Sequence, residues 1–237
     1  MPYGYYYWFD PTYILVIIGA ILCGIASWKV RSTYAKYSSV GNNKGITGAE
    51  AARTILESQG IYDVEVVHIR GELTDNYNPS TKVLSLSDST FASSSVAAVG
   101  VAAHECGHAV QHHKGYAPIA MRNAILPFAN LGSTLSWVLI IVGAIMFRSN
   151  TGHLLINIGI IAFSAVVLFQ LVTLPVEFNA SSRALKILRQ IGMFDEAELS
   201  MTRKVLGAAA MTYVASAASS ILQLLRLVLL FGGRRDD

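Results

Sequence analysis

Long apolar runs alternate with shorter polar stretches along the chain. A run of about 17 or more apolar residues is long enough to cross the hydrocarbon layer of a membrane as a helix. Polar residues beyond the last run interrupt its pattern, so the sequence predicts three to four transmembrane helices. The runs lie at residues 12–28, 129–147, 154–176 and 205–222.

The longest polar portion lies between the first two apolar runs. Thr47 and Glu50 have the spacing of a capping box, which predicts that a helix begins here. Three short segments follow this helix, two with the pattern of strands and one with turn residues: 64–69, 82–87 and, between them, 75–79. A further helix comes next, so an edge strand beside it could pair with an extended peptide. The order predicts a small α+β portion.

This next helix carries the residues with the clearest chemistry. His104-Glu105-Cys106-Gly107-His108 is an H-E-x-x-H motif. Four residues are slightly more than one helical turn, so both histidines face the same side and could bind one Zn²⁺. Glu105 is then close enough to act as a general base toward water. Chance is the alternative, but histidine and glutamate are costly in such an apolar helix unless something pairs with them.

The same helix has further features that bear on its packing and on which of its histidines could bind a metal. Gly100, Ala103 and Gly107 form a stripe of small residues where another helix could approach closely. His112 and His113 are interpreted as polar residues at the helix end rather than as metal ligands. The two histidines of the motif therefore need a ligand from elsewhere in the chain.

Glu177 is the expected third ligand. The second and third apolar runs form a hairpin, which returns the chain to the side of the motif, and Glu177 is the first acidic residue after it. His153 falls on the opposite side, and the acidic residues in 195–198 lie in a stretch that we expect to be solvated. The alternative for Glu177 is a capping or surface carboxylate at the membrane boundary.

Composition supports a membrane protein. Hydrophobic residues make up 53% of the 237 residues and charged residues only 14%, whereas soluble domains carry about 25% charged residues. The net charge of +3 is too small and too dispersed to suggest nucleic acid as a partner. Cys23 and Cys106 give no disulfide framework, and Cys106 points across the helix from the two histidines.

The distribution of lysine and arginine predicts the orientation. Residues 1–11 contain none and are rich in aromatic residues, which suits an uncleaved anchor that begins at the membrane interface. Residues 29–122 contain nine, 148–153 one and 177–204 five, so the motif and Glu177 are expected to face the cytoplasm. A full fourth crossing would leave Arg234 and Arg235 outside, so a re-entrant last segment, or one packed against the catalytic part, is the alternative.

Three features together resemble a known family: the N-terminal anchor, the H-E-x-x-H motif before a membrane hairpin, and Pro175-Val-Glu177-Phe-Asn-Ala-Ser. Nearly end to end, the chain resembles the YugP-type membrane zinc metallopeptidases of bacteria. It is more distantly similar to the HtpX and CAAX prenyl protease group of gluzincins. The resemblance implies that His104, His108 and Glu177 bind zinc and that Glu105 is the catalytic base.

One difference from the HtpX-type pattern concerns the residues around the zinc ligands. That pattern has an acidic residue four positions after the glutamate, where this chain has Ser181. We therefore expect Asn179, Ser181 or Asp88 to orient a zinc-binding histidine instead. Tyr213, in the last apolar run, is a candidate oxyanion donor, and simple packing is its alternative role.

The sequence thus predicts a mainly α membrane protein with a small α+β zincin-like cytoplasmic portion, multi-pass in the bacterial inner membrane. It would be a zinc-dependent endopeptidase with a single Zn²⁺ per chain, acting on peptide or membrane-protein substrates at the cytoplasmic surface of the lipid bilayer. A non-catalytic protein with a structural zinc site is the alternative. The oligomeric state stays open. The expected segments are an anchor (1–30), a metallopeptidase portion (31–121), a transmembrane hairpin (122–176), a third-ligand helix and connector (177–204), and an apolar helix with a basic tail (205–237).

Overall fold

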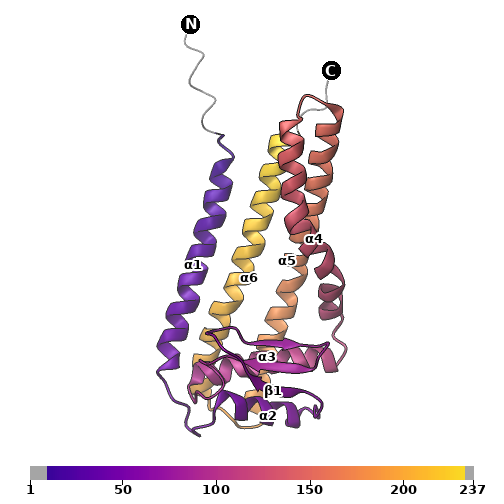
Figure 1. The fold of residues 1–237 in the computed structure, drawn as a ribbon. Coiled ribbons are helices and arrows are strands. Elements are labelled where there is room, and N and C mark those ends of the chain that lie inside the picture. Colours follow the sequence, from indigo (N-terminus) through magenta and orange to yellow (C-terminus); the bar gives the residue numbers. More distant parts are fainter. Residues whose placement is uncertain (1–9, 233–237) are drawn as a thin grey trace. The chain divides into compact units, whose positions relative to one another are not determined.

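The computed structural model describes residues 10–232, which form six helices and a small sheet (Figure 1). The predictions for the aromatic residues before residue 10 and for the basic tail after residue 232 lie outside the described residues. The elements in chain order are α1 (Tyr13–Ser38), α2 (Gly48–Ser58), β1 (Glu65–His68), β2 (Asn76–Asn78), β3 (Val83–Leu86), α3 (Val96–His113), α4 (Ala117–Ile145), α5 (Asn150–Gln190) and α6 (Glu196–Phe231).

The chain divides into two compact units that interleave along the sequence. The first comprises Met1–Ile25, Met121–Thr173 and Tyr213–Asp237. The second comprises Ala26–Ala120 and Leu174–Thr212.

All four predicted apolar runs are helical, and each helix is longer than its run. Among residues 10–232, the helices α1, α4, α5 and α6 are long and apolar enough to cross a membrane. Only 11–22% of the residues in their most apolar windows are buried. Large side chains such as Ile25, Phe128 and Ile161 are instead exposed. A water-soluble protein seldom exposes apolar surface on this scale.

In the first unit, small residues bring α4 and α5 close together. A Cβ placed on Gly132 of α4 would lie 2.5 Å from the carbonyl oxygen of Ala162 on α5, and one on Gly159 would lie 2.9 Å from the carbonyl oxygen of Ser136. Small residues at contacts of this kind allow apolar helices to approach closely. The pairing forms the predicted helical hairpin.

The end of α6 meets the beginning of α1 within the same unit. The Arg226 guanidinium donates a hydrogen bond to the Asp10 carboxylate at 3.0 Å and lies 4.2 Å from the centre of the Tyr13 ring. Gln223 and Arg226 are the polar residues that interrupt the apolar sequence after residue 222, and α6 continues through both to Phe231. The ion pair explains how a charged residue is accommodated there.

In the second unit, α2 and α3 pack with a three-stranded sheet of order β1-β3-β2 (Figure 1). β1 and β3 are parallel, and β2 and β3 are antiparallel. The predicted capping box is confirmed, since Thr47 accepts a hydrogen bond from the Glu50 backbone N–H and the Glu50 carboxylate accepts one from that of Thr47. Side chains such as Ile55, Leu84 and Val99 form the buried core.

The prediction of a turn at residues 75–79 is wrong, because residues 76–78 form β2. The Asp75 carboxylate accepts hydrogen bonds from the backbone N–H and the hydroxyl of Ser87, which holds this segment against the end of β3. The chain turns later, where the Asn78 side chain accepts hydrogen bonds from the backbone N–H groups of Ser80 and Thr81. Asparagine thus directs the turn from its first residue.

The stripe of small residues on α3 makes the close contacts that were predicted. A Cβ on Gly107 would lie 2.5 Å from the carbonyl oxygen of Ala180 on α5. A Cβ on Gly100 would lie 2.8 Å from the Thr202 methyl carbon on α6. Since Gly107 lies between the histidines of the motif, this contact presses that part of α3 against α5.

Candidate metal centre

Three predicted ligand side chains converge between α3 and α5. His104 and His108 lie one turn apart on α3, and Glu177 comes from α5. The Glu177 Oε2 atom lies 3.2 Å from Nε2 of His104 and 3.5 Å from Nε2 of His108. Glu177 is almost wholly buried, with 2% of its side chain exposed. In the described part of the chain, these three residues form the one cluster of this kind that could hold a metal ion.

The distances from the Glu177 carboxylate to the two imidazoles fit zinc. Zinc binds imidazole nitrogen and carboxylate oxygen at about 2.0–2.1 Å, usually with tetrahedral geometry. Two ligand atoms on a tetrahedron of that size are about 3.3 Å apart. The two distances from Glu177 Oε2, 3.2 and 3.5 Å, lie on either side of that value. The chemistry of the donors, two imidazoles and a carboxylate, is also that of catalytic zinc sites.

Hydrogen bonds on the far side of each ring fix the direction in which the imidazoles point. His104 Nδ1 lies 3.1 Å from the Ser181 hydroxyl, and His108 Nδ1 lies 3.1 Å from the Gln111 amide oxygen. An amide oxygen can only accept, so neutral His108 carries its proton on Nδ1. Its Nε2 lone pair is then free to face Glu177, as a metal ligand requires.

Gln111 links His108 to α5. Its amide nitrogen donates hydrogen bonds to the Val176 carbonyl oxygen at 2.8 Å and to the Asn179 side-chain oxygen at 3.0 Å. Arg183 donates to the same Asn179 oxygen at 2.7 Å. Gln111 is wholly buried. Sequence reasoning missed this residue, although its position three residues after His108 places it on the same helical face.

The residues expected to orient the histidines are only partly brought to them. Ser181 contacts His104 directly, while Asn179 acts one step away, through Gln111. Asp88 does neither, since it accepts hydrogen bonds from the His68 ring and from the Gly71 backbone N–H. Neutral side chains rather than a carboxylate therefore contact the outer ring nitrogens of the two histidines.

Charges nearby act on His108. Burial opposes its protonation, but the Glu177 carboxylate and the charge of Glu105 raise its pKa above the ordinary value. A metal ion at the cluster would therefore compete with protons for this ring. Glu105 is half-buried, and none of the described residues forms a hydrogen bond or an ion pair with its carboxylate. It is thus available as a proton acceptor.

Cys106 takes no part in the cluster, in agreement with the prediction. Its side chain is wholly buried on the other side of α3, where the thiol contacts the carbonyl oxygen of Ala52. Burial raises the pKa of this thiol well above its usual value. It therefore behaves as a small apolar core residue rather than as a thiolate ligand.

Three other residues considered from the sequence stay apart from this cluster or are not placed relative to it. His112 and His113 are exposed, and His112 Nδ1 lies 3.2 Å from the Tyr77 hydroxyl. Tyr213 lies on α6 in the first unit, so its role as an oxyanion donor stays a prediction.

Replacing Gln111 with leucine is expected to weaken zinc binding by about 10–100-fold, the usual effect of losing a partner of a ligating histidine. Leucine has a similar size but removes the acceptor for His108 Nδ1 and the bonds to α5. Competition with a chromogenic chelator measures the affinity, and His112→Ala serves as control because His112 lies outside the cluster. Equal affinities for Gln111→Leu and the unmodified protein would show that Gln111 does not orient the ring.

Comparison with known proteins agrees with this donor set. Residues 12–232 match a family model described as "Putative neutral zinc metallopeptidase". The chain is also 45% identical to the "Putative membrane protease YugP" of Bacillus subtilis (strain 168), over 95% of this chain and 99% of that protein. No solved structure matches the chain. The family model covers nearly all of the sequence, so the chain belongs to the family of neutral zinc metallopeptidases that this model describes.

Proposed function

We propose that the protein is a membrane-embedded, zinc-dependent endopeptidase that hydrolyses proteins at or near the cytoplasmic membrane surface. The observation that carries this proposal is the convergence of His104, His108 and Glu177, with Glu105 beside them and free of partners. Membership of a zinc metallopeptidase family supports the same chemistry.

In this proposal, His104, His108 and Glu177 would hold the zinc ion. Zinc, when bound, supplies Lewis acidity toward a peptide carbonyl and toward water. Glu105 takes a proton from the attacking water and later delivers it to the leaving amine nitrogen. Ser181 and Gln111 keep the two imidazoles turned toward Glu177.

The number of ligands favours a catalytic site over a structural one. Structural zinc sites are usually closed by four protein ligands, whereas catalytic sites have three and leave a position open. The cluster within residues 10–232 has three ligand residues. This count supports the peptidase rather than a protein in which zinc only joins two helices.

The apolar helices support the membrane location. The most apolar windows of α1, α4, α5 and α6 are largely unburied, as lipid-facing helices would be. Contact between Asp10 and Arg226 supports a full fourth crossing, because it pairs the beginning of α1 with the end of α6. With four crossings, the basic segments 29–122 and 177–204 lie on one side, which the excess of lysine and arginine identifies as the cytoplasm.

Cleavage of one peptide in two forms tests the proposal. We expect zinc-loaded protein in liposomes to cleave the peptide faster when a transmembrane helix tethers it than when it is free in solution, because tethering raises its effective concentration at the site. Glu105→Gln protein prepared in parallel controls for contaminating proteases. Faster cleavage of the free form would contradict the location at the membrane surface, and no cleavage of either form would contradict the peptidase.

A further inference from the structure

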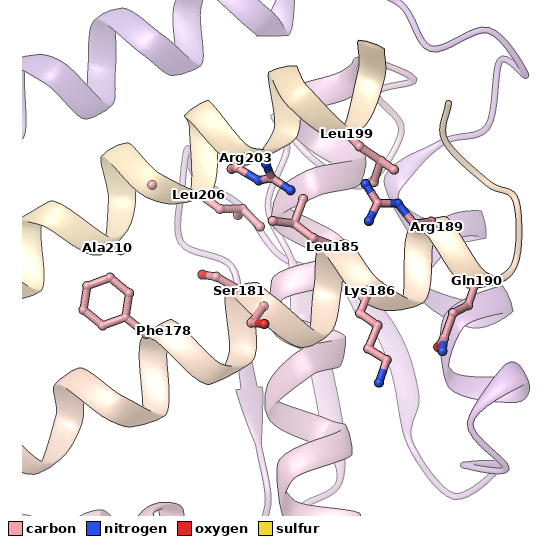
Figure 2. A pocket seen from close by; sticks show the side chains of 12 residues that line it. Phe178, Ser181, Leu185, Lys186, Arg189, Gln190, Leu199, Arg203, Leu206 and Ala210 are labelled. Atoms are coloured by element: carbon pink, nitrogen blue, oxygen red, sulfur yellow. The ribbon is translucent and has the colours of Figure 1, made fainter. Parts of the chain in front are cut away.

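A groove runs between the second half of α5 and the first half of α6, within the second unit (Figure 2). Its volume is about 630 Å³, which lies within the range of ligand-binding pockets. Leu185, Leu199 and Leu206 contribute apolar walls. Figure 2 shows Phe178 and Ala210 at one end of the groove and Arg189 at the other.

The groove begins next to the candidate metal centre. Ser181, which lines it, is the residue whose hydroxyl lies 3.1 Å from His104 Nδ1. Phe178, also in the lining, directly follows Glu177 along α5. A chain lying in the groove would therefore contact Ser181, which connects the groove to the proposed ligand His104.

The charge of the groove has one sign. Lys186, Arg189 and Arg203 line it, and no aspartate or glutamate does. Arg189 is paired with Glu196, outside the lining, at 2.7 Å. Lys186 and Arg203 are exposed, and no described acidic residue lies within ion-pair distance of either. Two cations thus face an apolar groove without a partner.

Resting on the proposed function, we propose that this groove binds the substrate polypeptide on one side of the scissile bond and selects segments that combine apolar residues with an acidic one. The apolar walls would take the apolar side chains, and Lys186 and Arg203 would pair with the carboxylate. Along α5, Ser181 and Arg189 are eight residues apart, or about 12 Å. An extended peptide covers that length in about four residues, so the acidic residue lies two to four positions from the end at Ser181.

The dimensions favour a polypeptide over an anionic lipid as the occupant. Lys186 lies ten residues beyond Val176, the last residue of the third apolar run, which is about 15 Å along the helix. The headgroup layer of a bilayer is only about 5–8 Å thick on each side. A lipid in the membrane would therefore stop short of the basic end of the groove, whereas a substrate chain extending into the cytoplasm would reach it.

The test uses matched fluorogenic peptides with glutamate or glutamine two, three or four residues from the scissile bond, on either side of it. We expect the full-length, zinc-loaded protein to show a KM about 3–10-fold lower for the best glutamate peptide than for its glutamine partner. The Lys186→Gln/Arg203→Gln double variant should lose this preference, with the KM of the glutamate peptide rising to that of its glutamine partner. Lys204→Gln removes a neighbouring charge outside the groove and should keep it.

The outcomes separate this inference from the proposed function. Cleavage of all peptides with no preference for glutamate, or a preference that the double variant retains, would overturn the groove assignment and leave the peptidase standing. Fluorescence anisotropy of labelled peptides on Glu105→Gln protein tests the groove without catalysis, with the same 3–10-fold preference expected for the acidic peptide. The inference would also be wrong if phosphatidylglycerol vesicles bound the protein through Lys186 and Arg203 and phosphatidylcholine vesicles did not. An anionic lipid rather than a polypeptide would then be the occupant of the groove.

Discussion

Glu105→Gln protein is expected to retain zinc and to lose at least about 10²–10⁴-fold of the rate of peptide hydrolysis, the usual contribution of a general acid–base group. Glutamine has nearly the same size as glutamate but cannot accept a proton from water. The Glu105 carboxylate has no hydrogen-bond or ion-pair partner among the described residues, so the substitution breaks no such contact there. Initial rates on casein and elemental analysis of the same samples measure the two effects.

Glu57→Gln is the matched control for this experiment. Glu57 is an exposed glutamate on α2, outside the metal cluster, so its variant should keep both zinc and activity. Casein cleavage by Glu105→Gln protein at the rate of the unmodified protein would show that another group acts as the base.

Glu177→Gln protein is expected to lose zinc itself. The substitution leaves two imidazoles, fewer than the three protein ligands of a catalytic zinc site. We therefore expect the loss of affinity to exceed the roughly 10–100-fold loss that accompanies removal of a residue behind a ligand. Zinc content after gel filtration should fall from about one ion per chain to a small fraction of that, and activity should fall with it.

The zinc content distinguishes the two glutamates. Glu105→Gln should separate activity from metal binding, and Glu177→Gln should abolish both together. Full zinc content in Glu177→Gln protein would mean that Glu177 is a buried neighbour of His104 and His108 rather than a ligand.

The long helices were predictable from hydropathy, but their ends were not. The first apolar run stops at Trp28, whereas α1 continues to Ser38. In its last turns the Tyr34 hydroxyl donates to the Ser89 carbonyl oxygen, and Tyr37 is buried against α3 residue Ala97. Hydropathy identifies the apolar part of a helix, whereas tertiary contacts decide how far its backbone hydrogen bonds continue.

The stretch at the beginning of α6 shows the same limit. Its acidic residues were expected to be solvated, yet Glu198 is buried. The Glu198 carboxylate accepts a hydrogen bond from the Asn43 backbone N–H at 2.7 Å and another from that of Asp195. Composition alone could not indicate this, because the partner Asn43 lies more than 150 residues away along the chain.

The centre itself was predictable where its chemistry is local in sequence. The spacing of His104 and His108 follows from the helical repeat, and the hairpin indicated that Glu177 returns to their side. The partners behind the rings were harder to predict. Ser181 was one of three residues expected to orient a histidine, and Gln111 was not among them. A serine or glutamine in a helix has many ordinary roles, so its type alone does not indicate this one.

The close contact between Gly107 and Ala180 bears on how the protein would take up a metal ion. That contact and the hydrogen bonds of Ser181 and Gln111 with the two rings are made between protein groups alone and hold the imidazoles in place. Zinc fingers, by contrast, are unfolded without metal. We therefore expect that folding of this chain does not require the metal and that a stripped sample can be reloaded without a refolding step. In the cell, zinc supply rather than assembly of the scaffold would then set the fraction of competent molecules.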